Sequence, residues 1–223
     1  MTEQVHEQAG RQALLESALA MNSRGLNQGS SGNLSLRLAA GMLITPSALP
    51  YHRCTPEDMV LVGWDGTVQG RCRPSSEWRM HHDIYLAYEE AKCILHTHAP
   101  WCSTLACLER GIPSQHYMVA LAGGEDIRCT PYAPFGTQEL SNAAVAGLKG
   151  RSAALLGHHG LICYAAGLDQ VLALAAEVEF LAQVYAQSLQ ITSTPPLLPP
   201  EAITSLLERF AAYKQLGQDT NRA

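Results

Sequence analysis

Residues 93–98 read Cys-Ile-Leu-His-Thr-His, an apolar run that ends in two histidines separated by one residue. Such a run is typical of a buried strand, in which side chains two positions apart lie on the same face. His96 and His98 can therefore converge on one metal ion, while Thr97 points to the opposite face. A third ligand has to come from elsewhere, and the His-His pair at 158–159, between strand-like segments, is a candidate source. The alternative is a pair of strand histidines that are satisfied only by hydrogen bonds.

The composition limits the classes of protein to which the chain can belong. The chain has 223 residues, of which 47% are hydrophobic and 16% charged, and we expect a single domain over residues 1–223. The formal net charge is −5 and the basic residues are scattered, which argues against a nucleic-acid or membrane partner. The polar stretch 1–12 predicts no signal peptide. Seven cysteines without a Cys-x-x-Cys pair argue against a disulfide framework and favour a reducing, cytoplasmic compartment.

Helix-like and strand-like segments alternate along the chain. Amphipathic or capped segments predict helices over residues 5–24, 74–90, 100–111, 137–148, 168–189 and 201–213. Alternating or short apolar segments predict strands over residues 34–38, 42–45, 59–64, 93–98, 153–156 and 161–164. Hairpin-like links occur beside the strand-helix alternation. The pattern therefore predicts an α/β fold, with a mixed, mostly antiparallel central sheet that helices cover on both sides.

Three polar stretches could hold an anion such as a phosphate group. Residues 29–33 read Gly-Ser-Ser-Gly-Asn, residues 45–47 read Thr-Pro-Ser, and two serines stand at 75–76, where a helix is expected to start. Glycines let the backbone approach a ligand closely, and a helix N-terminus offers free N–H groups. Each stretch also has a simpler interpretation, as a flexible turn or a helix cap. Glu77 follows in the expected first turn, either to complement the helix dipole or to ligate the ion and transfer protons.

Seven segments follow one another in a specific order over nearly the whole chain. They are GSSGN (29–33), ITPSALPY (44–51), PSSEWRMH (74–81), HTHAPWC (96–102), PSQHYM (113–118), PYAPFGT (131–137) and HHGL (158–161). In this ordered set the chain resembles the class II aldolase/adducin family, and within it the members that cleave L-fuculose 1-phosphate. The set is far more specific than the two-histidine motif alone.

The resemblance implies roles for individual residues. A zinc ion, one per subunit, would be held by His96, His98 and His159, with Glu77 as a fourth ligand that swings away to act as the acid/base. Tyr117 would donate a proton to the aldehyde oxygen in the site of an adjacent subunit. The other implied residues are the phosphate ligands Gly32, Asn33, Ser47, Ala48, Ser75 and Ser76, the aromatic Phe135 on the aldehyde side, and Tyr213, which would reach the adjacent subunit's site. The family pattern has a glycine where this chain has Ala48, and alanine tolerates fewer backbone angles.

The implied activity is cleavage of a ketose 1-phosphate, L-fuculose 1-phosphate or a close relative, to dihydroxyacetone phosphate and an aldehyde such as L-lactaldehyde. A divalent ion on the substrate oxygens would stabilise the enediolate as a Lewis acid. The alternative aldolase route uses a desolvated lysine as a Schiff base. The chain has only Lys92, Lys149 and Lys214, and none lies in a segment expected to be buried, which favours the metal route. The resemblance also implies a homotetramer with its sites at subunit interfaces.

Other functions stay open on the same scaffold. A sugar-phosphate 4-epimerase shares the retro-aldol chemistry, but relatives of that kind usually carry aspartate at the position of Glu77. A dehydratase or decarboxylase also binds zinc and phosphate, whereas a non-catalytic, adducin-like interaction module has no use for the histidines. We expect His81 and His82 to be structural or solvent-exposed, and Glu177 and Glu179 to be interface or solvent residues.

Overall fold

The computed structural model describes the backbone of residues 3–220 and the side chains of residues 5–210 and 212. Within this part of the chain, one eight-stranded sheet has the strand order β4-β3-β2-β1-β5-β8-β7-β6. All neighbouring strands are antiparallel except β6 and β7, so the predicted mixed, mostly antiparallel sheet is confirmed. The strands are β1 (Asn33–Arg37), β2 (Gly41–Ile44), β3 (Val60–Gly63), β4 (Val68–Gln69), β5 (Cys93–Thr97), β6 (Cys129–Thr130), β7 (Ala153–Leu156) and β8 (Gly160–Ala165).

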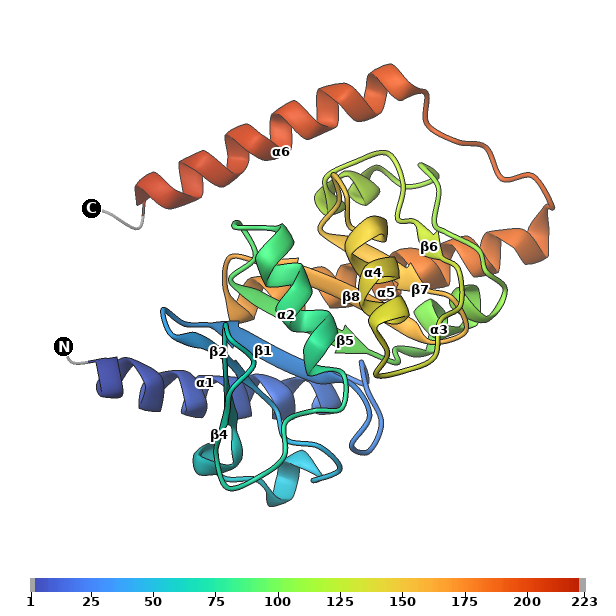
Figure 1. The fold of residues 1–223 in the computed structure, drawn as a ribbon. Helices are drawn as coiled ribbons and strands as arrows, with labels where there is room; N and C mark the ends of the chain where they lie inside the picture. Colours follow the sequence, from blue (N-terminus) through green and yellow to red (C-terminus); the bar gives the residue numbers. More distant parts are fainter. Residues whose placement is uncertain (1–2, 221–223) are drawn as a thin grey trace.

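Helices cover both faces of the sheet (Figure 1). On one face lie α2 (Trp78–Ala87) and α4 (Gln138–Gly147), and on the other α1 (Glu3–Ser23), α3 (Pro100–Cys107) and α5 (Leu168–Ile191). The last helix, α6 (Pro200–Thr220), is red in Figure 1 and contacts the short helix η3 (Tyr117–Ala122). Two further single-turn helices, η1 (Tyr51–Arg53) and η2 (Pro56–Asp58), precede β3. No helix in the described range combines the length and the apolarity that crossing a bilayer requires.

The alternation of side chains along each strand builds two separate cores. Along β5, Ile94 packs in the core under α2 and α4, whereas Cys93 and Leu95 belong to the core under α1, α3 and α5. Every residue of β2 and of β5 is buried. Strands that are covered on both faces are apolar at successive positions, which explains why residues 93–95 form a continuous apolar run.

Three predicted helix boundaries were wrong by four residues or more, and one of them is the end of α3, at Cys107 instead of near residue 111. The helix that was expected from residue 74 begins at Trp78, with Glu77 as its N-cap residue. The preceding segment is extended because Ser75 donates its backbone N–H to the Thr45 carbonyl, and Ser47 donates its own to the Arg73 carbonyl. The last helix reaches Thr220 instead of ending near residue 213.

Candidate active site

The sheet brings the candidate ligands together at the end of its central strands. Asn33 in β1 and His96 in β5 are paired across the two strands. His98 follows β5, and His159 lies in the turn that joins β7 to β8, the neighbour of β5. Residues that are about sixty positions apart in the sequence therefore meet because their strands are adjacent.

Hydrogen bonds to the backbone set the direction of the His96 ring. Its Nδ1 lies 2.9 Å from the Leu161 carbonyl oxygen, to which it can only donate. A neutral ring that carries its proton on Nδ1 has a free lone pair on Nε2, the atom that faces the site. Thr97 points to the opposite face, as predicted, and its hydroxyl donates to the Leu26 carbonyl.

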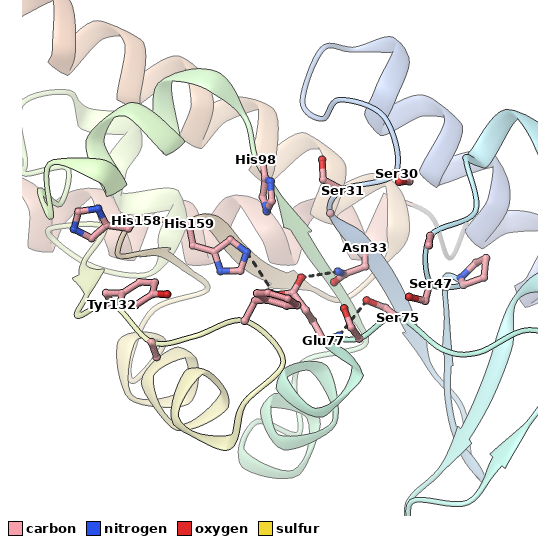
Figure 2. Close-up of a pocket in the computed structure, with 16 residues that line it drawn as sticks. Ser30, Ser31, Asn33, Ser47, Ser75, Glu77, His98, Tyr132, His158 and His159 are labelled. Carbon is pink, nitrogen blue, oxygen red and sulfur yellow. Dashed lines mark hydrogen bonds and ion pairs between the residues drawn. The ribbon is translucent and has the colours of Figure 1, made fainter.

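Three imidazoles and one carboxylate surround a common point. The ligand nitrogens of His96, His98 and His159 lie within 4.8 Å of one another, and the Nε2 atoms of the first two are 3.1 Å apart. Glu77 places Oε2 3.3 Å from Nε2 of His96 and Oε1 3.5 Å from Nε2 of His159. In Figure 2, Glu77 lies between His159 on one side and Asn33 on the other.

This arrangement fits a divalent metal ion. Four ligands at 2.0–2.1 Å from a tetrahedral ion lie about 3.3–3.4 Å from one another, close to the distances above. Oε1 of Glu77 is buried and has no hydrogen-bond partner among the described residues, although an ionised oxygen in the interior requires one. His96, His98, His159 and Glu77 are therefore suited to hold such an ion.

Burial keeps the ligands in the protonation states that metal binding requires. It lowers the pKa of His96 and of His98, and it lowers the pKa of His159 to about 4. Burial acts to raise the pKa of Glu77, but the adjacent His96 and His159 and the hydrogen bond from Asn33 outweigh it, so that this pKa lies below its usual value. Near neutral pH the site presents neutral imidazoles beside a carboxylate, the donor set of many catalytic metal sites.

A cavity of about 360 Å³ opens beside this cluster. Figure 2 shows Ser47 and Ser75 on one side of Glu77, and Tyr132 and His158 on the other. None of the described residues that line the cavity is a lysine or an arginine. An anion bound there would meet hydroxyl and amide donors in place of a cationic side chain. The lining residues are Ser30, Ser31, Gly32, Asn33, Pro46, Ser47, Ala48, Ser75, Ser76, Glu77, His98, Tyr132, Ala133, Phe135, His158 and His159.

All six residues that were expected to bind phosphate line this cavity. Gly32 has a φ of 69°, and a Cβ there would lie 2.8 Å from the His96 carbonyl oxygen, so a side chain is excluded. Its own carbonyl accepts a hydrogen bond of 2.8 Å from the buried Tyr51 hydroxyl, which fixes the loop. Ala48 has a φ of 57°, in the left-handed region that glycine tolerates best. The departure from the family pattern therefore falls at a strained position.

Phe135 and Tyr117 are placed differently from each other. Phe135 lines the cavity and is 72% exposed, and Tyr132, which was not anticipated, also lines it. Tyr117 begins η3, is 49% exposed and does not line the cavity of its own chain. Tyr213 belongs to α6, but its side chain lies outside the described residues.

Two residues have partners that pattern reasoning missed. His81 is fully buried and makes hydrogen bonds to Asn33 and Ser35. Glu179 is partly buried, and its carboxylate accepts the backbone N–H groups of Trp101 at 2.8 Å and Cys102 at 2.9 Å. It therefore caps α3, the helix that follows His98.

Comparison with known proteins agrees with this geometry. The profile of the Class II Aldolase and Adducin N-terminal domain matches residues 12–186. This chain belongs to the class II aldolase and adducin family. The 5-methylthioribulose-1-phosphate/5-deoxyribulose-1-phosphate aldolase of Rhodospirillum rubrum is 47% identical over 93% of this chain and 94% of its own length. The L-fuculose phosphate aldolase of Escherichia coli strain K12 is 45% identical over 90% of this chain and 93% of its own.

A solved structure supports the same membership. An L-fuculose 1-phosphate aldolase superposes with a TM-score of 0.88 at 33% identity, covering 91% of this chain and 96% of its own. The α/β fold with helices on both faces of the sheet is thus the fold of this family. The chain is a class II aldolase, a carbon–carbon lyase of a metal-dependent class, and its three-histidine cluster is where that class would bind the metal.

Proposed function

We propose that this aldolase uses zinc to cleave a ketose 1-phosphate to dihydroxyacetone phosphate and an aldehyde. The substrate would be L-fuculose 1-phosphate, which releases L-lactaldehyde, or a close relative. The observation that carries the proposal is the meeting of His96, His98, His159 and Glu77 beside a cavity whose other polar side chains are hydroxyls, the Asn33 amide and the His158 imidazole. Zinc suits three nitrogens and one carboxylate at these separations.

The phosphate group would lie on the side of the cavity formed by Asn33, Ser47, Ser75 and Ser76, with backbone donors from Gly32 and Ala48. Ser75 and Ser76 come just before α2, so the positive end of that helix dipole also faces an anion at this place.

Proton transfer falls to residues of the protein. When bound, the metal ion supplies a Lewis acid that stabilises the negative charge developing on the dihydroxyacetone phosphate fragment. Cleavage also needs a proton to leave the C4 hydroxyl and another to reach the carbon left behind. Glu77 is ionised and its Oε1 is unpaired within the described structure, so it is suited to accept the proton of that carbon in the reverse, condensation direction. In cleavage it would first take up a proton and then pass it to the carbon. In the condensation direction, Tyr117 of a neighbouring subunit would donate a proton to the aldehyde oxygen, which becomes the C4 hydroxyl.

A homotetramer with sites at subunit interfaces belongs to the same proposal. It is supported by the exposure of Tyr117 at 49% and Phe135 at 72%, since neither aromatic ring is covered within its own chain. The seven cysteines are all free, which is consistent with a cytoplasmic enzyme. We also propose that residues 1–223 act as one domain.

The substrate test uses the zinc-loaded protein with L-fuculose 1-phosphate, 5-methylthioribulose 1-phosphate and 5-deoxyribulose 1-phosphate, following the release of dihydroxyacetone phosphate. Release from any of them supports the proposal, and the ratio of kcat/KM values identifies the preferred aldehyde. Inversion at C4 without fragments would favour an epimerase. Absence of turnover with all three compounds would contradict the proposed activity.

A substitution at Glu77 tests its acid/base role. Glu77→Gln keeps the size and an oxygen ligand but removes the ability to accept a proton, so kcat should fall by about 10²–10⁴-fold while most zinc is retained. Glu89→Gln is the matched control, since Glu89 is an exposed carboxylate just after the same helix. Unchanged kcat in the Glu77 variant would refute the role.

A further inference from the structure

A chain of buried polar side chains leads from Glu77 into the interior under α2. Oε2 of Glu77 accepts a hydrogen bond of 3.0 Å from the Asn33 amide nitrogen, and Oδ1 of Asn33 lies 2.5 Å from Nε2 of His81. On the other side of the ring, Nδ1 of His81 lies 2.7 Å from Oγ of Ser35, which is 2.8 Å from the Tyr85 hydroxyl. Asn33, Ser35, His81 and Tyr85 are at most 3% exposed.

Secondary structure explains why these groups meet. Asn33 and Ser35 are two residues apart on β1, so both point to the face that α2 covers. His81 lies four residues after Glu77 and therefore on the same side of α2, where its ring reaches both β1 side chains. His81 is thus held between two strand residues and cannot turn without losing a bond.

The carboxylate of Glu77 fixes the direction of every bond in the chain. An ionised carboxylate only accepts, so Asn33 has to turn its NH2 group toward Glu77 and its oxygen toward His81. Burial lowers the pKa of His81 to about 3, so its ring is neutral and carries one N–H, which must be on Nε2. Nδ1 then accepts from the Ser35 hydroxyl, whose oxygen accepts from Tyr85. Each of these links therefore has one donor and one acceptor.

The orientation of the Asn33 amide affects two contacts, because its NH2 group has two N–H bonds. One serves Glu77, and Asn33 also lines the cavity, where the other N–H can meet an anion. A half-turn of the amide would present its oxygen to a carboxylate and to a phosphate group, and both contacts are repulsive. The Glu77 carboxylate selects the first orientation, and the hydrogen bond from His81 to the amide oxygen holds the side chain in it.

We infer that His81 is a positioning residue, which holds the Asn33 amide with its NH2 group toward Glu77 and the cavity. Its contribution to turnover rests on the proposed function, but its contribution to metal binding does not. Loss of the bond leaves the Asn33 amide, the partner of Glu77, held at one end only. Zinc affinity should then fall about tenfold or more, as is usual when the partner of a metal ligand is removed, and kcat/KM should fall with it.

Two amide substitutions separate positioning from packing. The amide of His81→Gln reaches the place of Nε2 and can still donate to Asn33, whereas the shorter side chain of His81→Asn reaches only the place of Nδ1, beside Ser35. Both are polar and similar in size. Zinc affinity, measured by competition with a chromophoric chelator, should stay within about threefold of wild type for the glutamine variant and fall about tenfold for the asparagine variant.

His82→Gln is the matched control, because His82 is the next residue of α2, is partly buried and hydrogen-bonds the Trp64 carbonyl away from the site. It should leave zinc affinity, kcat and KM unchanged. The inference is overturned if His81→Asn binds zinc and turns over substrate like wild type, or if His82→Gln lowers both as much as His81→Asn does. If the wild type binds zinc without cleaving any ketose phosphate, the proposed function fails while the zinc comparison still decides the role of His81. A wild type that binds no zinc would remove the basis of both.

Discussion

Replacing Ala48 with glycine is expected to raise the free energy of unfolding, because Ala48 has a φ of 57°. An L-residue in the left-handed region costs about 1–2 kcal/mol relative to right-handed backbone. Glycine removes that cost but gives the unfolded chain more freedom, which offsets about 0.4–1 kcal/mol. The net gain should be about 0.5–1 kcal/mol, which corresponds to a rise in Tm of roughly 1–4 °C for a chain of this length.

Urea unfolding of the metal-free protein measures this gain as a shift of the midpoint at constant m-value. Ala40→Gly is the matched control, since Ala40 is an exposed loop residue whose φ is not positive. There glycine gives only the entropic penalty, so stability should fall by about 0.5 kcal/mol. If Ala48→Gly lowers stability as Ala40→Gly does, the backbone of Ala48 is not strained and the reasoning is wrong.

Three further predictions concern the metal, the pH and α3. His96→Ala should lower zinc affinity by at least about a hundredfold and abolish turnover, as metal analysis after dialysis would show; retention of stoichiometric zinc would contradict its role as a ligand. For His81, whose pKa is about 3 in the folded protein and about 6.5 when unfolded, the unfolded chain takes up the proton first as the pH falls. His81 should therefore contribute up to about 1.4 kcal/mol per pH unit to the decline in stability of the metal-free protein from about pH 6.5 downward, in addition to the contributions of His96, His98 and His159. The decline should be less steep in His81→Gln, and parallel declines in urea titrations would refute this. Glu179→Ala should reduce the free energy of unfolding by about 1–3 kcal/mol, because two N–H groups at the start of α3 lose a charged acceptor; an unchanged urea midpoint would mean that water replaces it.

The sequence was sufficient for the features that depend on local pattern. The period-two placement of His96 and His98 predicted that both point to one side, and the structure brings them together with His159. The strand-like segments on either side of the second histidine pair became β7 and β8, and the order of helices and strands predicted the layers of the fold. These inferences needed no knowledge of which strands are neighbours.

The sequence pattern could not predict contacts that depend on how distant segments are aligned with each other. His81 seemed an ordinary helix residue because its partners, Asn33 and Ser35, lie more than forty positions away on a strand. Glu179 reaches the start of α3 from the middle of α5, which no spacing rule predicts. The start of α2 was misplaced because two serines are a good cap signal, whereas backbone pairing with residues 45–47 holds residues 73–75 extended.

Tyr132 and Phe135 belong to the connection from β6 at the edge of the sheet to α4, whereas Asn33 and His96 lie on paired inner strands. A peripheral connection can accept substitutions that inner strands, hydrogen-bonded on both sides, cannot. Under the proposed function, in which Phe135 lies on the aldehyde side, selection can thus exchange one aldehyde for another at the rim and leave the metal site as it is. This division offers a reason why two relatives, 47% and 45% identical to this chain, bear the names of different sugar phosphates.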